Sequence, residues 1–355
     1  MPNQIFHTCE VKELITMESL QICQHSMRNQ QLTKLEILRE LDKRKALPED
    51  LENERIRLDM GNQGEQKVLS YIQQFGCEHW QVIPNLWLDY FGKFECDLLL
   101  LTTAGIYPFE IKNYTGKFEF RKSQCLINGK KIGHNAIAQA QKVYINIKSI
   151  LDAASIPVNL QGAVIFIGSH NEVVIHDSIE DIDIVRSTQL RNYIWKIAQE
   201  ERNYHGVPID FQKIIQALNI FKTENPFGQD DIPENIKARV QKGILCSRCG
   251  SFNLKTNLSY ISCKCGMHEP RENAIVRTIC EYGVIHHNKD LTIAELVEFF
   301  DGDISRSTIR KYLKKHFAQV GNSRSIKYIN KILPFNSLQK EFQLTNHRKL
   351  EIFHY

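Results

Sequence analysis

Two neighbouring stretches, Glu95-Cys-Asp97-Leu-Leu-Leu-Leu101 and Gly105-Ile-Tyr-Pro-Phe-Glu110-Ile-Lys112, determine how this chain folds. Both are apolar runs of strand length, and the Thr-Ala-Gly segment between them is typical of a turn. Side chains alternate between the two faces of a strand, so Glu110 and Lys112 share one face while Ile111 points into the core. If the hairpin brings Asp97 beside Glu110, two carboxylates and one ammonium group converge at one place.

This grouping suits the hydrolysis of phosphodiester bonds. Carboxylate oxygens are the ligands that Mg²⁺ prefers, so we expect Asp97 and Glu110 to hold Mg²⁺ or Mn²⁺. A bound metal polarises the phosphate and activates water, and Lys112 would position that water or offset developing negative charge. A simpler alternative is an exposed edge strand that carries an ordinary Glu–Lys pair.

Further motifs occur in a fixed order around these strands: Gly61-Asn-Gln-Gly64-Glu65, Asp97 before four leucines, Gly105 to Gly116, and Asn135-Ala-Ile-Ala-Gln139. Together they resemble the nuclease-related domain, NERD, a branch of the PD-(D/E)xK nuclease superfamily. The resemblance covers about residues 58–175. It implies a restriction-endonuclease-like fold and a metal-dependent nuclease that acts on DNA.

The resemblance also implies roles for single residues. Asp97 and Glu110 would bind the metal, with the Ile111 carbonyl as a third ligand, and Lys112 would be the catalytic lysine. Glu65 would reach the metal or a water molecule, and Gln139 would orient the substrate or Lys112. Ala136 stands where the family pattern often has proline, which concerns the loop rather than the chemistry.

The pattern outside these motifs predicts an α/β core with a mixed sheet flanked by helices. We expect one helix over 32–41, a helix start at Pro48 and a separate helix over 63–75 that Gly61 and Gly64 introduce. Further strands are predicted at 80–88, 164–167 and 183–185, with a tight hairpin turn at Asn128-Gly129. Further helices are predicted at 135–153, 188–200 and 209–221.

Four of the ten cysteines form two short-spaced pairs, each followed by glycine. Cys246 and Cys249 make the first pair, and Cys263 and Cys265 the second. Four thiolates give Zn²⁺ a closed tetrahedral shell, so the pattern predicts a structural zinc ribbon. His268 could replace one cysteine, and reduced thiols without a metal or a redox pair are the alternatives. The other six cysteines are expected to be small buried apolar residues.

The C-terminal region is basic. Residues 235–332 hold 17 lysine and arginine residues against 8 aspartate and glutamate residues, although the whole chain carries only +4. Helices at 272–285, 291–300 and 305–317, followed by a hairpin at 319–329, resemble a winged helix-turn-helix whose third helix enters the major groove of DNA. The residues expected to contact nucleic acid are Arg306, Arg310, Lys311, Lys314, Lys315, Arg324 and Lys327. A protein-binding or purely structural helical module is the alternative.

Six parts are therefore expected: N-terminal helices (1–57), a nuclease-like domain (58–224), a linker (225–242), a zinc ribbon (243–269), a winged-helix-like module (270–332) and a tail (333–355). Hydrophobic residues make up 42% of the chain and charged residues 24%, as in a soluble globular protein. The first residues lack the pattern of a signal peptide, so we expect a cytoplasmic protein.

A homodimer is one option for an enzyme that cuts both DNA strands. The competing functions are a DNA-binding or regulatory protein with an inactive nuclease fold, and a zinc-dependent interaction module on such a body.

Overall fold

The computed structural model describes residues 32–121, 124–133, 135–169, 171–176, 180–226, 232–321 and 326–330. The chain divides into two compact units. The first contains residues 60–226 and the second contains residues 32–59 together with the described residues after 231. The expected tail, 333–355, lies outside the described residues, as do residues 1–31.

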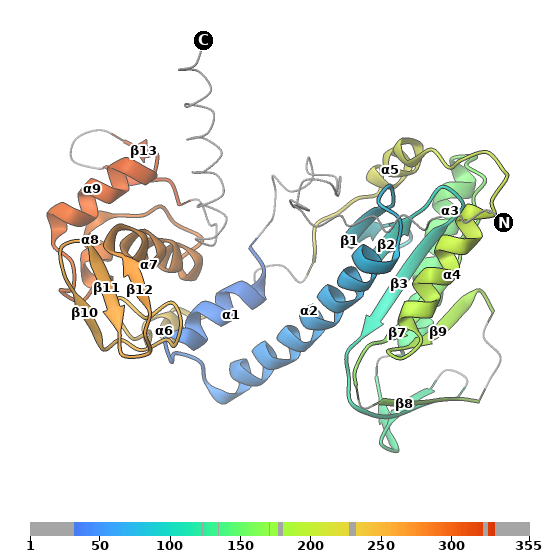
Figure 1. Ribbon diagram of the computed structural model, residues 1–355, viewed down its shortest axis with the longest axis horizontal. Coiled ribbons are helices and arrows are strands. Elements are labelled where there is room, and N and C mark those ends of the chain that lie inside the picture. Colours follow the sequence, from blue (N-terminus) through green and yellow to red (C-terminus); the bar gives the residue numbers. More distant parts are fainter. Residues whose placement is uncertain are drawn as a thin grey trace, which may run out of the picture. The chain divides into compact units, whose positions relative to one another are not determined.

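The first unit is built on a mixed five-stranded sheet in the order β1-β2-β3-β7-β9 (Figure 1). Strands β1 (Gln81–Asp89), β2 (Lys93–Leu101) and β3 (Ile106–Lys112) are antiparallel neighbours. Strands β7 (Gly162–Phe166) and β9 (Ile182–Arg186) continue the sheet in parallel with β3. The expected strands at 80–88, 95–101, 105–113, 164–167 and 183–185 are thus present.

Four helices cover the two faces of this sheet. Helices α3 (Ala136–Ala153) and α5 (Phe211–Asn219) pack on one face, in a core that includes Leu99 and Leu101. Helices α2 (Glu49–Phe75) and α4 (Leu190–Arg202) pack on the other face, against Leu98 and Leu100. The four consecutive leucines of β2 are therefore buried on both sides, which explains why this strand has no polar alternation. The prediction of a mixed sheet flanked by helices is confirmed.

A second sheet of four strands, in the order β6-β5-β4-β8, belongs to the same unit. Its strands are β4 (Gly116–Arg121), β5 (Gln124–Ile127), β6 (Lys130–Ile132) and β8 (Asn171–Ile175). The predicted hairpin turn is confirmed, because β5 and β6 are joined by Asn128 and Gly129, both with positive φ. The pairing of β4 with β8, about fifty residues apart in sequence, was not predicted.

Helix α2 corrects the prediction of two helices at its position. It runs without a break from Glu49 to Phe75, so Gly61 and Gly64 lie inside it instead of introducing a second helix. Each helical glycine costs only about 1 kcal/mol relative to alanine, which a long and well-packed helix tolerates. The first part of α2 belongs to the second unit and the remainder to the first.

The second unit contains helices α1 (Lys34–Lys43), α6 (Glu234–Lys237), α7 (Arg271–Ile285), α8 (Ile293–Phe299) and α9 (Arg306–His316). Strands β10 (Leu254–Thr256), β11 (Tyr260–Cys263) and β12 (His268–Pro270) form one sheet, and β13 (Gln319–Val320) and β14 (Lys327–Tyr328) form a short ladder. Helix α7 lies in the centre of its core, with every residue from Ala274 to Ile285 buried. Three residues from the range of the expected linker, Ile232, Ile236 and Val240, pack in this core. The six-part division of the chain stays a prediction.

A buried arginine ties α1 to the segment that leads into the first cysteine pair. Arg44 has no exposed surface, and its guanidinium donates to the carbonyls of Gln241 and Gly243 and to Glu281 at 2.6–3.1 Å. Arg277 of α7 binds the other oxygen of Glu281 at 2.7 Å and also donates to the Leu245 carbonyl. The two arginines therefore fix residues 241–245 against the helical core.

In the part of the chain that the structure describes, no helix is both long enough and apolar enough to span a membrane.

Candidate functional site

Asp97, Glu110 and Lys112 come together on the two central strands. The β2–β3 pairing ends at Leu98 and Phe109, so Asp97 and Glu110 are the next residues on their strands. The Asp97 carboxylate accepts a hydrogen bond from the backbone N–H of Ile111 at 2.7 Å. Glu110 forms an ion pair with Lys112 at 2.6 Å. The expected convergence of two carboxylates and an ammonium group is therefore present in the geometry.

The Glu110–Lys112 pair does not lie on an edge strand. Strand β3 has β2 on one side and β7 on the other, and Glu110 is only 5% exposed. Ile111 points the opposite way, into the core beneath α2 and α4, as the alternation predicts. A buried carboxylate is costly unless it is compensated, so this pair differs from an ordinary surface ion pair.

Helix α2 approaches the end of β3 at Gly64, and this approach places Glu65. A Cβ atom at position 64 would lie 2.8 Å from the Cβ of Asn113 and 3.1 Å from a methyl carbon of Ile167. The Asn113 side chain also donates to the carbonyl of Met60 at 2.7 Å. Glycine at position 64 is therefore required by close packing inside the helix, and the next residue, Glu65, is brought to the acidic site.

The carboxyl groups of the site influence one another. Burial, followed by the charge of Asp97, raises the pKa of Glu110 to about 8 and that of Glu65 to about 7. Burial also raises the pKa of Asp97, against the opposing effects of Lys112 and the Ile111 N–H. Burial alone would lower the pKa of Lys112, but Glu110 and Asp97 raise it above its usual value. The site is thus acidic and favours a cation.

Glu95 is a member of the site that the sequence prediction did not include. It lies two residues before Asp97 on β2, opposite Trp87 of β1, whose side chain is hydrogen-bonded to it. Burial, then Asp97 and Glu65, raises the pKa of Glu95 to about 7. The spacing of two residues along a strand was the signal that could have identified it, since such side chains share a face.

Gln139, the remaining side chain expected at the site, lies on α3. It is exposed in the first turn of α3, and its side chain makes no hydrogen bond within the described part of the chain. Asn135 caps this helix by accepting from the N–H groups of Ile137 and Ala138. The helix therefore begins regularly at Ala136, without the proline of the family pattern. The role expected for Gln139 stays a prediction.

The oxygen donors at the acidic site suit Mg²⁺ or Mn²⁺ in kind. In this structure, however, Glu110 is directed to Lys112 and Asp97 to the Ile111 N–H. Among the described residues, four cysteines are the only compact group of three or more side chains whose ligand atoms could surround a metal. The contribution of the Ile111 carbonyl to a metal site stays a prediction.

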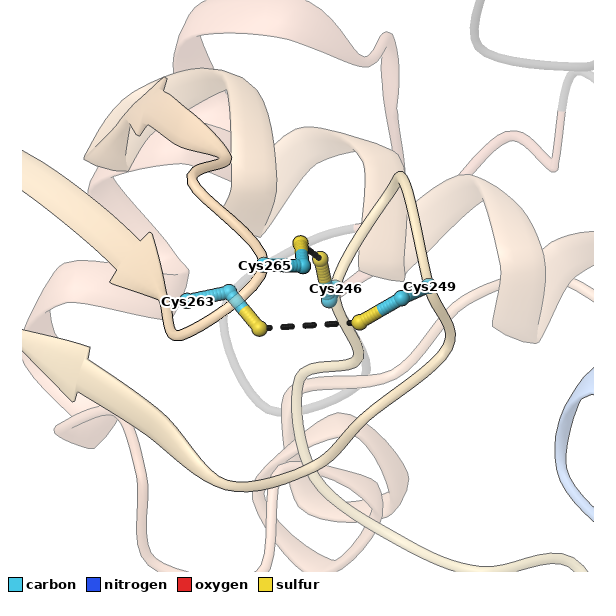
Figure 2. Close-up of side chains that lie close together, drawn as sticks. All are labelled: Cys246, Cys249, Cys263 and Cys265. Carbon is cyan, nitrogen blue, oxygen red and sulfur yellow. Dashed lines mark hydrogen bonds between the residues drawn. The ribbon is translucent and has the colours of Figure 1, made fainter.

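Those four cysteines are the predicted ones. Figure 2 shows Cys246 and Cys249 facing Cys265 and Cys263, and all four sulfur atoms lie within 4.8 Å of one another. The Cys246–Cys265 and Cys249–Cys263 sulfur distances are both 3.6 Å. A disulfide is about 2.05 Å long, whereas a tetrahedral site with Zn–S bonds of about 2.3 Å separates its sulfurs by about 3.8 Å. The arrangement therefore fits a zinc site and not disulfides.

Backbone N–H groups lie close to the cysteine pairs. Gly250 and Gly266 adopt positive φ and donate their N–H groups to the carbonyls of Cys246 and Cys263. Although burial opposes it, the N–H groups of Cys249 and Arg248 lower the pKa of Cys246 to about 7. His268 lies outside the cluster, stacked on Tyr260 with ring centroids 4.4 Å apart. The four cysteines therefore complete the group without it.

Helix α9 presents the expected basic side chains to solvent. It begins at the N-cap Ser305, whose hydroxyl accepts from the N–H of Thr308. Its exposed cationic residues are Arg306, Arg310, Lys311, Lys314 and Lys315, and Lys327 is exposed on β14. Of these, Lys315 is bound to Glu272 at 2.7 Å. Arg324 lies outside the described residues. The winged helix and its contacts with nucleic acid stay predictions.

Comparison with known proteins identifies one part of this chain. Residues 60–167 match the family model of the nuclease-related domain, NERD. This range contains α2 from Met60 onward, strands β1 to β7 and helix α3. No curated protein and no solved structure matches the chain. The expected resemblance over 58–175 is therefore confirmed for its greater part.

Proposed function

We propose that this nuclease-related domain is an active, metal-dependent nuclease whose site consists of Asp97, Glu110, Lys112 and Glu65. The observation that supports it most strongly is the buried Glu110–Lys112 ion pair on a central strand, next to Asp97. A purely structural role would not require a charged pair at this position, because an apolar pair could fill it at lower cost. The match to the nuclease-related domain includes all four residues.

Asp97 and Glu110 would hold Mg²⁺ or Mn²⁺ through their carboxylate oxygens, with the Ile111 carbonyl as a further ligand. When bound, the metal supplies Lewis-acid polarisation of the phosphate and lowers the pKa of a coordinated water. Lys112 keeps its proton, because Glu110 and Asp97 raise its pKa. Its ammonium group is therefore a permanent cation that can stabilise the negative charge that develops at phosphorus.

Glu65 contributes differently from the two strand carboxylates. Its pKa of about 7 means that near neutral pH it can accept a proton as well as give one up. A carboxylate at this pKa suits the orientation or deprotonation of the attacking water. In this proposal Gln139 orients the substrate from the exposed start of α3.

DNA is the proposed substrate, and the second unit would help to hold it. The exposed arginines and lysines of α9, with Lys327, would contact phosphates in the manner of a winged helix. The four cysteines would bind Zn²⁺ as a structural ribbon, held to α7 through Arg277. The zinc would then fix the shape of this unit and take no part in hydrolysis.

A cleavage panel tests the proposal. Linear, nicked, circular and single-stranded DNA, together with RNA, are incubated with Mg²⁺ or Mn²⁺ and with the wild type or Lys112→Ala. Lys196→Ala, an exposed lysine on α4, is the matched control. We expect metal-dependent cleavage by the wild type and the control, and none by Lys112→Ala. Binding of DNA without cleavage by any form would favour the inactive DNA-binding alternative.

A further inference from the structure

Tyr114 lies directly beyond the acidic site, on the short link from β3 to β4. It is 40% exposed, and it is the second residue after Lys112. Its side chain lies within electrostatic range of the Lys112 ammonium group. An exposed aromatic ring therefore stands beside the lysine of the proposed catalytic centre.

The ring of Tyr114 is supported from inside the protein. Phe118, which is only 2% exposed, lies nearly parallel to it, with an interplanar angle of 20° and centroids 6.1 Å apart. The backbone at Tyr114 is also closely packed. The Lys112 carbonyl accepts from the N–H of Ile167, and Gly168 lies so close to the Tyr114 carbonyl oxygen that a Cβ would not fit. The Tyr114 ring thus offers a flat, partly solvated surface that is packed from inside.

A basic hairpin is attached to the same link. Asn128, in the turn between β5 and β6, exchanges hydrogen bonds of 2.8 Å with both the N–H and the carbonyl of Lys117. These bonds fix the turn to Lys117, which is only five residues after Lys112 in the sequence. Lys130 and Lys131 follow the turn, and both are exposed without an ion pair to any residue in the described ranges.

We propose that Tyr114 stacks on an unpaired base next to the cleaved phosphodiester bond, while Lys130 and Lys131 bind the phosphates of the same strand. This inference rests on the proposed nuclease function and names its substrate as a strand that is single at the cut. A base inside a duplex already has both faces covered by its neighbours. Only an unpaired or terminal base can lie on the Tyr114 ring, and aromatic stacking accepts any base.

The test uses the whole chain of residues 1–355 with Asp97→Ala, which should bind without cutting. The cut position is mapped first with the wild type on single-stranded DNA. A single 2-aminopurine is then placed at each nucleotide that flanks the cut, because its fluorescence is quenched by stacking. Quenching is expected at one of these positions. Tyr114→Ala should abolish it and weaken binding about tenfold, whereas Tyr114→Phe should retain both.

Two control sets accompany these variants. Tyr204, 41% exposed on the loop after α4, is the matched tyrosine, and Tyr204→Ala should change neither quenching nor affinity. Lys130→Ala combined with Lys131→Ala should make the slope of log K against log salt concentration less steep by about 1.4. This is the value expected for the loss of two phosphate contacts on a single strand. Lys196→Ala combined with Lys213→Ala removes two lysines from α4 and α5 and should leave it unchanged.

Quenching tests the role of Tyr114, whereas cleavage tests the proposed nuclease function. Metal-dependent cleavage with quenching that Tyr114→Ala does not alter would overturn the stacking role and leave the nuclease intact. If Tyr114→Phe loses as much quenching and affinity as Tyr114→Ala, the stacking role would also be overturned, because the effect would then come from the hydroxyl group. Equal cleavage of fully paired duplex and single strand would contradict the unpaired substrate. The absence of cleavage on every nucleic acid would overturn the proposed function itself.

Discussion

Gly64 of α2 packs directly against Asn113 at the end of β3, so closely that a Cβ at position 64 would lie 2.8 Å from the Cβ of Asn113. The same segment is held by the hydrogen bond from the Asn113 side chain to the Met60 carbonyl. Through this contact the helix that carries Glu65 is fixed to the strand that carries Glu110 and Lys112.

Substitution of this glycine should therefore separate the helix from the strand. Gly64→Ala introduces overpacking, which typically costs about 1–3 kcal/mol, and should also reduce cleavage by displacing Glu65. Gly61→Ala is the matched control, because a Cβ there meets nothing within 4 Å. It should stabilise the exposed helix by up to about 1 kcal/mol. Urea denaturation measures the free energy of unfolding, and cleavage assays measure the displacement of Glu65. Equal stabilities and equal cleavage rates of the two variants would contradict the close packing of Gly64 against Asn113.

The raised pKa of Glu65 predicts a pH dependence of stability. The unfolded carboxyl group loses its proton near pH 4.5, whereas the folded one keeps it until about pH 7. The folded state thus binds more protons between these values, so this group's contribution to stability is lost as pH rises through 7. Without added Mg²⁺ or Mn²⁺, Glu65→Gln should melt close to the wild type at pH 5 and above it at pH 8.

The same melting experiment on Glu52→Gln provides the control. Glu52 is exposed on the same helix and should give the same small difference from the wild type at both pH values. If the Glu65→Gln difference does not grow between pH 5 and pH 8, Glu65 does not lie in an acidic and partly buried site.

Sequence reasoning could predict the central sheet and the acidic triplet because their signals are local. The four leucines after Asp97 indicate a strand buried on both faces, and the alternation around Ile111 orients Glu110 and Lys112. Gly64 could not be interpreted correctly, since its partner Asn113 is far away in sequence and glycine usually indicates a boundary. The pairing of β4 with β8 is equally non-local. Glu95 was overlooked although its spacing from Asp97 is the same two-residue spacing that singled out Glu110 and Lys112.

Metal removal should affect the second unit. The cysteine group should hold one zinc per chain, and Cys246→Ser should lose that metal together with the fold of strands β10 to β12. Cys77→Ser, a cysteine of the first unit outside the cluster, should keep the zinc. Metal analysis of protein purified without chelators measures the content. Less than half an equivalent of zinc in the wild type would contradict the assignment.

The buried arginine gives a prediction about stability. Arg44→Ala would remove one of the two arginines that bind Glu281 and leave the carbonyls of Gln241 and Gly243 without this donor. Breaking a buried ion pair in this way typically costs about 3–5 kcal/mol. Arg57→Ala removes an arginine that is 70% exposed and should change stability by less than about 1 kcal/mol. Urea denaturation that shows equal losses for the two variants would contradict the role given to Arg44.

We propose that Asp97, Glu110 and Lys112 together make this domain a metal-dependent nuclease. The most direct measurement is the cleavage of labelled single-stranded and duplex DNA by the wild type, Lys112→Ala and Lys196→Ala, with and without Mg²⁺ or Mn²⁺. We expect cleavage only with metal, a rate at least a hundredfold lower for Lys112→Ala (about 2.7 kcal/mol in the barrier), and no change for Lys196→Ala. Cleavage that Lys112→Ala retains in full, or no cleavage by the wild type with either metal, would contradict it.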